Sequence, residues 1–536
     1  MAKALGIDLG TSNCCVALLD GNKPRVLPDE RGNSTTPSYM TILANGKSLV
    51  GHLAKVQVIS NPYQTAYQIK RLMGRRVDDP KIDSIKQIVG YQIVAGENGQ
   101  ACIKLGEQLL SPIDISCLYL KAMKDIAHYN LQGEEVKDVI ITVPAYFNDM
   151  QRKATKEAGE KAGFNVLRLI NEPTAAALAY GYRKEMNKKI AVFDLGGGTF
   201  DISILEVNGG VFEVIGTHGD SFLGGHDFDN RIVELVIEDF KAKNNLDLRM
   251  DKMALQRIKD ACENAKCELS SAEKAQINLP FIASHDGSSL NLDFIITRKK
   301  FEEVTADLVK RTIDICDAVL KESGLKKTDL EDILLVGGQT RMPMVGKAVA
   351  EYFGKPPVKG VHPDEAVALG AAIQAEILET KSKDVLLLDV TPLSLGILSS
   401  GDIFTKIVEK NTKVPIRVSK LFTTTHDNQE RVKVVILQGE GVKASQNFPL
   451  GEFVLEGIRK APRMEPKIQV TFRIDADGIL NVQAQDLDTG QVQQVTIRDY
   501  ISPDEVRKSA GQGAKATDGG TLFDEESLEV VPVGEG

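Results

Sequence analysis

One short pattern occurs twice in this chain, and it constrains the fold more than any other feature. The copies are Gly6-Ile7-Asp8-Leu9-Gly10-Thr11-Ser12-Asn13 and Phe193-Asp194-Leu195-Gly196-Gly197-Gly198-Thr199-Phe200-Asp201. Each is an apolar strand followed by an aspartate, a glycine-rich turn and a threonine. Glycine permits a positive φ, so several backbone N–H groups of such a turn can point at one anion. An aspartate at the strand end can hold Mg²⁺ through its water ligands. Two facing copies predict a site for a triphosphate chain, whereas two ordinary tight turns are the alternative.

Length and composition limit the classes of protein that fit. A chain of 536 residues is too long for one core, so two to four domains are expected. The net charge of −9 argues against nucleic acid as the main partner. No apolar run is long enough to span a bilayer and no signal peptide is recognisable at the start, so no membrane partner is expected. Seven cysteines, an odd number without a CxxC pair, are typical of reduced thiols and a cytoplasmic location.

The chain changes character near residue 380. Residues 1–380 alternate apolar strands, such as 139–143 and 333–336, with amphipathic helices, such as 229–244 and 301–320, which predicts an α/β domain. A linker at 381–391 carries an apolar run. Period-2 strands in 392–501 predict an all-β sandwich. We expect residues 502–536 to begin a helix at a capping box, which glycines soon end, and to continue as a disordered tail. A short contact segment within that tail, at 522–523 or 528–531, is the less favoured alternative.

Further residues fit nucleotide chemistry. The pairs Gly224-Gly225 and Gly337-Gly338 allow close approach to a ribose or phosphate, and Arg341 can stack its guanidinium on adenine. Phosphoryl transfer to water needs a cation on the departing charge and a positioned nucleophile. Lys70 and Glu172 are candidates for these two roles. From the residues alone, solvated surface charges are the default explanation for both.

Longer motifs carry a resemblance to a known family. Besides the two copies above, they include 333–343 (Ile-Leu-Leu-Val-Gly-Gly-Gln-Thr-Arg-Met-Pro), 385–392 (Val-Leu-Leu-Leu-Asp-Val-Thr-Pro), 141–147 and 171–181. Together these segments resemble the signatures of the DnaK-type heat-shock chaperone family, from residue 2 to about residue 500. The resemblance implies an α/β actin/hexokinase-like ATPase domain of two lobes, followed by an all-β sandwich that binds peptide. It also implies an ATP-dependent chaperone of the stress response that acts on unfolded polypeptides.

The resemblance assigns roles in the first domain, with ATP or ADP and Mg²⁺ as cofactors. Phosphate contacts are implied for Gly10, Thr11, Ser12, Asn13, Gly196, Gly197, Gly198 and Thr199. Mg²⁺ would be held through water by Asp8 and Asp194. Lys70 and Glu172 would serve hydrolysis, with Thr199 and Asp201 beside the γ-phosphate. Adenosine contacts are implied for Glu263, Lys266, Ser270, Gly338, Arg341 and Asp364. The i, i+3 and i+7 spacing places Glu263, Lys266 and Ser270 on one helical face.

The resemblance also covers the β-domain and the partners. Ile397, Phe422, Val432 and Val434 match the peptide pocket, although the same residues equally suit a sandwich core. Leu387 and Asp389 match an interdomain switch, and Pro144 and Arg152 match the relay to it. Arg168, Asn171 and Thr174 match positions that face a J-domain co-chaperone. Residues 276–298 resemble the segment associated with a GrpE-like nucleotide exchange factor.

The chain departs from the family pattern in several places. Family members usually carry a helical lid after the β-domain, whereas this chain is expected to lack most of it and so to release peptide faster. His226 replaces an acidic residue near the nucleotide, and Cys267 stands where some relatives use arginine. Ser400 and Thr425 replace larger residues over the peptide, which indicates a looser hold.

Three other functions remain open at this point. A sugar kinase and an actin-like scaffold share the phosphate turns, but neither accounts for a β-domain behind a leucine-rich linker. A specialised lidless holdase or regulator with weak turnover fits every motif equally well.

Overall fold

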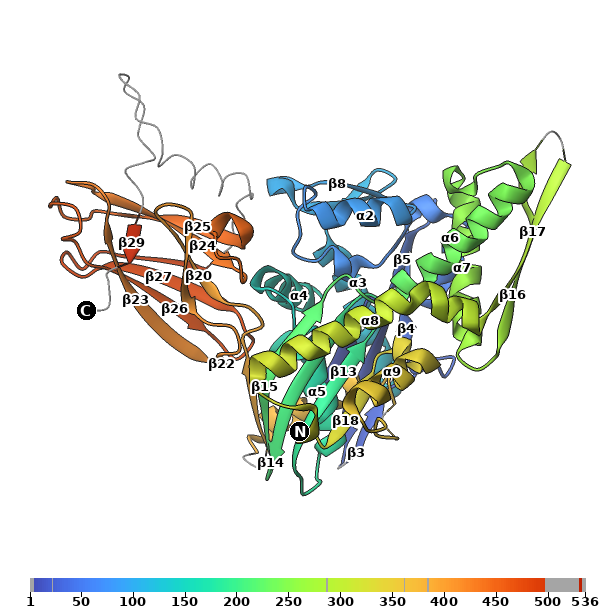
Figure 1. Ribbon diagram of the computed structural model, residues 1–536, viewed down its shortest axis with the longest axis horizontal. Helices are drawn as coiled ribbons and strands as arrows, with labels where there is room; N and C mark the ends of the chain where they lie inside the picture. The colour runs from blue at the N-terminus through green and yellow to red at the C-terminus, as the bar shows by residue number, and fades with distance from the viewer. Residues whose placement is uncertain are drawn as a thin grey trace, which may run out of the picture. The chain divides into compact units, whose positions relative to one another are not determined.

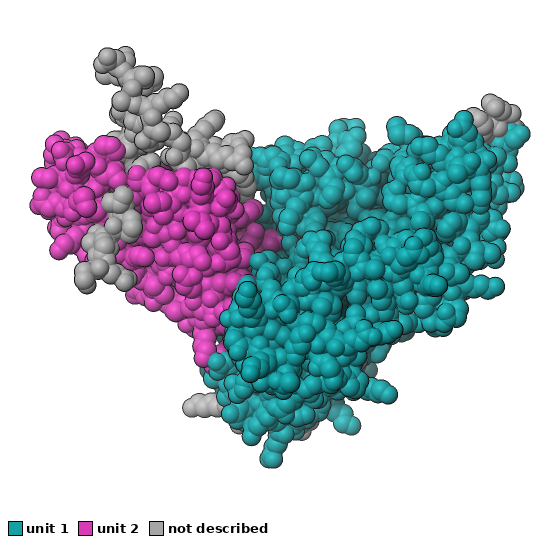
Figure 2. All heavy atoms as spheres, in the orientation of Figure 1, with its two compact units in different colours: residues 1–147, 153–387 teal, residues 148–152, 388–536 magenta. Residues whose placement is uncertain are grey.

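The computed structural model describes residues 4–21, 23–285, 288–360, 362–382, 385–496 and 530–532. The chain divides into two compact units, coloured separately in Figure 2: unit 1 holds residues 1–147 and 153–387, and unit 2 holds residues 148–152 and 388–536. The division after Leu387 falls inside the predicted linker. The helix predicted from Ser502 lies outside the described residues.

The first lobe of unit 1 is built on a mixed sheet (Figure 1). Its strands are β1 (Leu5–Leu9), β2 (Asn13–Asp20), β3 (Lys23–Val26), β11 (Asp138–Val143) and β12 (Asn165–Asn171), in the order β12-β11-β1-β2-β3, with β4 (Thr36–Pro37) on β2. The run β1-β2-β3 is an antiparallel meander, and β11 and β12 extend it in parallel beside β1.

The second lobe repeats this arrangement. The strands β13 (Asn187–Leu195), β14 (Phe200–Asn208) and β15 (Val211–Asp220) form an antiparallel meander, and β18 (Asp332–Val336) runs parallel beside β13. The repeated sequence pattern thus corresponds to a repeated substructure. In each lobe the glycine-rich turn joins the first two strands of the meander, so the predicted duplication is confirmed.

Two helices lie between the sheets and contact each other. α10 (Ala366–Thr380) packs on β1 and β2, and α5 (Glu172–Gly181) packs on β13 and β14. Their crossing is close, because a Cβ added to Gly370 would lie 1.7 Å from the carbonyl oxygen of Ala175. Small residues at this crossing therefore fix the spacing between the two sheets that carry the glycine turns.

The remaining elements of unit 1 surround these sheets. The helices are α1 (His52–Ser60), α2 (Pro80–Ile88), α3 (Pro112–Asn130), α4 (Asp149–Lys161, beginning in unit 2), α6 (Gly225–Asn244), α7 (Lys252–Leu269), α8 (Arg298–Ser323) and α9 (Pro343–Phe353). Short sheets are formed by β5 (Tyr39–Ile42), β6 (Ser48–Val50) and β7 (Thr65–Tyr67), by β8 (Gln92–Ala95), β9 (Ala101–Leu105) and β10 (Gln108–Leu110), and by β16 (Lys274–His285) with β17 (Ser288–Thr297). Each lobe has its own large apolar core.

The predicted helices are present but longer than expected. The helix expected at 229–244 begins four residues earlier, at Gly225, because the Asp227 carboxylate accepts a hydrogen bond of 2.8 Å from the Gly224 N–H and caps the first turn. The helix expected at 301–320 is α8. None of the helices in the described ranges is both long and apolar enough to cross a membrane.

Unit 2 is a sandwich of two antiparallel sheets. One contains β21 (Ile403–Val408), β20 (Leu395–Ser399), β24 (Arg431–Gln438) and β25 (Phe448–Glu456), in that order. The other contains β28 (Val492–Thr496), β27 (Leu480–Asp486), β26 (Ile468–Ile474), β23 (Ile416–Thr424) and β29 (Val530–Pro532), in that order. The hairpin predicted at 475–478 joins β26 to β27 through Gly478, whose φ is 74°. The all-β prediction is confirmed.

The strand β29 corrects one expectation. A disordered tail was expected over residues 502–536, but Val530–Pro532 pair with β23. The reason is that β23 would otherwise have an unpaired edge, and a short β-branched segment can satisfy it.

Candidate functional site

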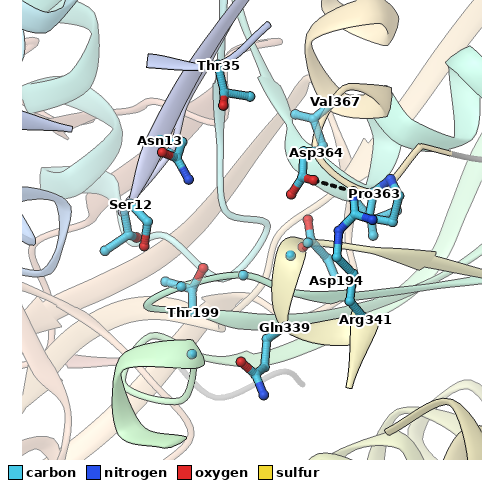
Figure 3. Close-up of a pocket in the computed structure, with 18 of the residues that line it drawn as sticks. Ser12, Asn13, Thr35, Asp194, Thr199, Gln339, Arg341, Pro363, Asp364 and Val367 are labelled. Atoms are coloured by element: carbon cyan, nitrogen blue, oxygen red, sulfur yellow. Dashed lines mark hydrogen bonds and ion pairs between the residues drawn. The ribbon is translucent and has the colours of Figure 1, made fainter. Parts of the chain in front are cut away.

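A pocket of about 340 Å³ opens in unit 1 beside both glycine turns (Figure 3). Such a volume is in the usual range for small-molecule sites. The predicted residues that line it are Asp8, Gly10, Thr11, Ser12, Asn13, Lys70, Glu172, Asp194, Gly196, Gly197, Thr199, Gly225, Glu263, Lys266, Ser270, Gly337, Gly338, Arg341 and Asp364. Residues that lie far apart in the sequence therefore converge on one cavity.

Two predicted residues do not line the pocket. The Gly198 carbonyl accepts two hydrogen bonds from the buried Arg71 guanidinium, at 3.0 and 3.2 Å. Asp201 is buried, and its carboxylate accepts a hydrogen bond of 3.0 Å from the Tyr146 N–H. Both therefore lie behind the pocket wall, where they support residues that face the cavity.

The two glycine turns approach each other so closely that larger residues do not fit. A Cβ added to Gly197 would lie 1.9 Å from Ser12 Oγ, and one added to Gly198 would lie 2.5 Å from Thr11 Cγ2. The Ser12 hydroxyl also lies 3.0 Å from His226 Nε2, which joins the first turn to α6. Turns of this kind present backbone N–H groups to an anion, so the two together suit a chain of phosphates.

Buried charges gather at the base of the pocket. Lys70 Nζ donates to Glu172 Oε1 at 2.5 Å, and both side chains are less than one-tenth exposed. Burial together with the negative charge of Glu172 raises the pKa of Asp8 to about 7. The same two causes raise the pKa of Asp194 well above its usual value. Burial disfavours a charged Lys70, yet the carboxylates of Glu172 and Asp8 raise the pKa of its ammonium.

This arrangement leaves an excess of negative charge. Three carboxyl groups, those of the buried Glu172 and Asp194 and of the partly exposed Asp8, gather at the ammonium of Lys70. A divalent cation would lower the pKa of the carboxylates and remove their mutual repulsion, so these residues fit Mg²⁺. In the described part of the chain, no three His, Cys, Asp or Glu side chains gather as direct ligands of a metal.

The wall formed by α6 and α7 is held by ion pairs. Lys266 Nζ lies 2.9 Å from Asp229 Oδ1 and donates to the Gly225 carbonyl at 3.1 Å. Burial opposes the charge on Asp229, but Lys266 lowers the pKa of that carboxyl, and Asp229 in turn raises the pKa of Lys266 against its own burial. Glu263 pairs with Lys55 of α1 at 3.0 Å.

The other residues predicted to contact adenosine also line the pocket. Glu263, Lys266 and the residue that caps α7, Ser270, all line the pocket, which confirms the predicted helical face. Arg341 pairs with Asp364 at 2.6 Å, as drawn in Figure 3, and remains about half exposed. Its guanidinium is therefore available to a planar ring.

Sequence reasoning missed several residues of the site. Thr35, Gln339, Pro363 and Val367 line the pocket, and Figure 3 shows them around its rim. Arg71 is buried and pairs with Asp227 at 2.5 Å while it holds the Gly198 carbonyl. No local pattern marks Arg71, because its partners are more than a hundred residues away in the sequence.

The predicted switch residues are distributed over both units. In unit 1, the Pro144 carbonyl accepts from the Phe147 N–H at 3.1 Å, and the linker's Leu386 N–H donates to the Gly210 carbonyl at 3.1 Å. Leu387 is the last residue of unit 1. In unit 2, Arg152 donates to the Asp477 carbonyl at 3.3 Å.

Asp389, the acidic residue of the linker, lies in a short antiparallel strand pair. Asp389, in β19 (Leu386–Val390), pairs with Val414 of β22 (Lys413–Val414), and its carboxylate accepts from the Val390 N–H at 2.8 Å.

The predicted peptide-pocket residues converge inside unit 2. Ile397 of β20, Phe422 of β23 and Val432 and Val434 of β24 are fully buried in one apolar cluster. Val530 of β29 belongs to the same cluster. These positions therefore serve as sandwich core and surround a segment distant in sequence.

A comparison with family models agrees with this architecture. The model described as Hsp70 protein matches residues 4–514, nearly the whole chain. Members of that family are ATPases that bind ATP or ADP with Mg²⁺ and act as chaperones on unfolded polypeptides together with co-chaperones. The duplicated lobes, the polar pocket and the β-sandwich are the features that the sequence motifs implied. This chain therefore belongs to the Hsp70 family.

Proposed function

We propose that this chain hydrolyses ATP and uses the nucleotide state to control binding and release of unfolded polypeptide segments. The observation that carries the proposal is the buried cluster of Asp8, Glu172, Asp194 and Lys70 beneath two facing glycine turns. A cluster of this kind is costly to bury without a ligand that supplies positive charge. Mg²⁺ with a nucleotide triphosphate supplies it.

The residues of the cluster divide the chemistry between them. The N–H groups of the two turns bind the phosphates. Asp8 and Asp194 would hold Mg²⁺ through water, and the ion would neutralise charge on the phosphate oxygens. Lys70 orients Glu172 through the 2.5 Å hydrogen bond, and Glu172 orients the attacking water and accepts its proton.

Two further residues support this centre. Thr199 lines the pocket at the second turn, where its hydroxyl can contact the terminal phosphate. Asp201 acts from behind the wall as a positioning residue, because the Tyr146 N–H fixes its carboxylate and its charge contributes to the raised pKa of Asp194.

The rest of the pocket would bind adenosine and the ribose. Glu263, Lys266, Ser270, Gly338, Arg341 and Asp364 form this side, and their ion pairs with one another and with Asp229 and Lys55 hold them in place. Arg341 would stack on the base.

Coupling would pass through the linker to the groove of unit 2. Leu387 and Asp389 would dock or release with the nucleotide state, with Pro144 and Arg152 as the relay. The groove lined by Ile397, Phe422, Val432 and Val434 would hold one apolar side chain of an extended peptide, whose backbone pairs with a strand edge.

Two surfaces suit the proposed partners in the cytoplasm. Arg168 retains exposed surface, whereas Asn171 and Thr174 are buried, so Arg168 would make the direct contact with a J-domain. The β16–β17 hairpin carries two exposed apolar side chains at separate positions, Phe281 (73% exposed) and Ile295 (58% exposed), which would contact a GrpE-like exchange factor.

The test is steady-state ATP hydrolysis with Mg²⁺, with and without an unfolded apolar peptide. We expect stimulation by the peptide in the wild type and its loss in Leu387→Asp, with basal turnover retained. The exposed Leu109→Asp is the matched control and should keep the stimulation. Hydrolysis that peptide never stimulates would favour the holdase or regulator, and stimulation by sugars would overturn the proposal.

A further inference from the structure

The residues that the proposed function assigns to the peptide groove of unit 2 pack around a segment of the same chain. β29 lies antiparallel to β23, with Val530 opposite Thr424, Val531 opposite Thr423 and Pro532 opposite Phe422 (Figure 1). It forms the outer strand of its sheet, so it completes the otherwise open edge of β23. This is the geometry in which an extended peptide adds to a sheet edge.

One side chain anchors the segment. Val530 is 1% exposed and packs in the cluster that contains Ile397, Phe422, Val432 and Val434. β29 also contacts β20 and β24, so the strands that carry these four residues surround it. Val530 therefore occupies the apolar site that the proposed function assigns to a side chain of a bound polypeptide.

The backbone of the anchor residue is held from the opposite side of the groove. The Ser400 N–H, just after β20, donates to the Val530 carbonyl at 3.1 Å. Backbone hydrogen bonds carry no information about side chains, so any extended segment with a suitable apolar residue could replace this one. β29 thus makes the backbone hydrogen bonds that a bound extended peptide would make, although it is a strand of the same chain.

The sequence accounts for the choice and the shortness of this segment. Val530 and Val531 are β-branched residues, which favour extended structure. Pro532 has no N–H group, which ends the ladder, and an edge strand is where proline is tolerated. Three paired residues and one buried anchor make a small contact, so a competing peptide can displace it.

We infer that Val530–Pro532 is a resident pseudosubstrate, which occupies the peptide groove intramolecularly and competes with incoming polypeptides. This inference rests on the proposed function and adds a regulation of its binding site. A segment tethered in the same chain acts at an effective concentration of about 1 mM. The affinity of an external peptide falls by the fraction of free grooves, so we expect a weakening of roughly tenfold.

The test uses the full chain and a fluorescein-labelled peptide with the sequence of residues 528–534, followed by fluorescence anisotropy. Val530→Asp should bind this probe about tenfold more tightly than the wild type, because a carboxylate is not accommodated among apolar side chains. Val530→Ser should show a smaller gain in the same direction. Leu522→Asp places the same charge in the same tail, outside β29, and should bind the probe like the wild type.

Hydrogen–deuterium exchange gives an independent measurement on the same proteins. The Ser400 amide should exchange faster in Val530→Asp than in the wild type, and added probe should restore its protection. Protection in the wild type should not depend on protein concentration.

These experiments distinguish a failure of the pseudosubstrate inference from a failure of the proposed peptide-binding function. Equal probe affinity in the wild type, Val530→Asp and Leu522→Asp would overturn the pseudosubstrate and leave the peptide groove intact. Failure of every variant to bind this probe and a second, leucine-rich peptide would overturn the proposed function itself. Protection of Ser400 that rises with protein concentration would overturn the intramolecular form, because the segment would then come from a second copy of the chain.

Discussion

The pocket of unit 1 and the proposed peptide groove of unit 2 differ in the chemistry of the residues that form them. The pocket gathers Asp8, Glu172 and Asp194 around the ammonium of Lys70, and burial together with the charge of Glu172 raises the pKa values of Asp8 and Asp194. The residues that we propose for the peptide groove are apolar, and Val530 packs among them. The first site therefore suits a charged ligand, whereas the apolar cluster of the second contains Val530 of the same chain.

The difference has a physical origin in the forces that each site uses. Charges removed from water destabilise a protein unless a partner of opposite charge compensates them. A bound cation therefore stabilises a site of buried carboxylates. Apolar surface is stabilised by any apolar group of suitable size, so a site of this kind accepts a segment of its own chain. We therefore expect the pocket of unit 1 to be most sensitive to the loss of a charge, and the apolar cluster of unit 2 to be most sensitive to the introduction of a polar group.

The largest effect is expected from the removal of the Lys70 ammonium, which pairs with Glu172. Lys70→Met leaves Glu172 buried and unpaired, so we expect a loss of about 3–5 kcal/mol in the free energy of unfolding. ATP turnover should fall at least 100-fold, since the variant removes charge stabilisation and the orientation of Glu172. Denaturant unfolding and steady-state turnover measure the two effects.

A matched lysine controls for the general effect of charge removal. Lys86 forms an exposed pair with Asp83 at 2.9 Å. Lys86→Met should change stability by no more than about 0.5 kcal/mol and leave turnover unchanged. A Lys70→Met variant as stable and as active as Lys86→Met would show that the cluster carries no functional charge.

The next effect concerns how the stability contributed by the Asp229–Lys266 ion pair depends on pH. The folded-state pKa of Asp229 is lowered, so its ion pair contributes stability above pH 3.8, and this contribution is lost as the pH falls through the folded pKa. The folded-state pKa of Lys266 is raised, so its contribution is present below pH 10.5 and is lost as the pH rises through the folded pKa.

Asp229→Asn should therefore be less stable than the wild type by about 3 kcal/mol between pH 5 and pH 9. The gap should narrow only below pH 3.8 or above pH 10.5, as urea unfolding at a series of pH values would show. A gap that closes near neutral pH would contradict the assignment.

The close approach of the two glycine turns predicts that a larger residue at Gly197 lowers the affinity for ATP. Gly197→Ala would place a Cβ 1.9 Å from Ser12 Oγ, so either the Ser12 hydroxyl must leave its contact with His226 or the turns must separate. We expect the affinity for ATP to fall roughly 10–100-fold, because backbone donors need accurate placement. Calorimetric titration with Mg²⁺ and a non-hydrolysable nucleotide analogue measures this change.

An open glycine in a helix is the control. A Cβ at Gly346 of α9 would meet nothing within 4 Å. Gly346→Ala should keep the nucleotide affinity and gain up to about 1 kcal/mol in stability. Equal affinities of the two variants would mean that the turns do not meet around the phosphates.

The smallest effect is expected in the groove. Val434→Thr keeps the side-chain shape but buries a hydroxyl in an apolar cluster, so we expect a loss of about 1–2 kcal/mol and weaker peptide binding. Val442→Thr, at a side chain that is 85% exposed, should be neutral. A Val434→Thr variant as stable as Val442→Thr would contradict an apolar groove.

The sequence predicted the pocket better than the contents of the groove. The glycine turns and the strands before them are local patterns, and the resemblance supplied Lys70 and Glu172, so nearly every predicted nucleotide residue lines the cavity. Arg71 was missed because its role depends on contacts with Gly198 and Asp227, which only the folded chain brings near.

The pairing of β29 was predicted only as the less favoured alternative, a contact segment at 528–531, for a similar reason. A three-residue strand has too little periodicity to be detected, and its partner β23 lies more than a hundred residues earlier in the chain. An acidic, glycine-rich context around Val530 favoured disorder, but the open edge of β23 and its apolar cluster outweighed that local preference.

Nucleotide should change the pocket of unit 1 strongly, whereas peptide should meet a proposed groove that β29 already fills. The most direct measurement is hydrogen–deuterium exchange of the full chain, with and without Mg²⁺ and ADP, and with and without an apolar peptide near its Kd. The account predicts that nucleotide strongly protects residues 6–13 and 193–201, whereas peptide scarcely changes protection of 397–400 and 421–425. Strong new protection of those groove segments by peptide, with the glycine turns unaffected by nucleotide, would contradict it.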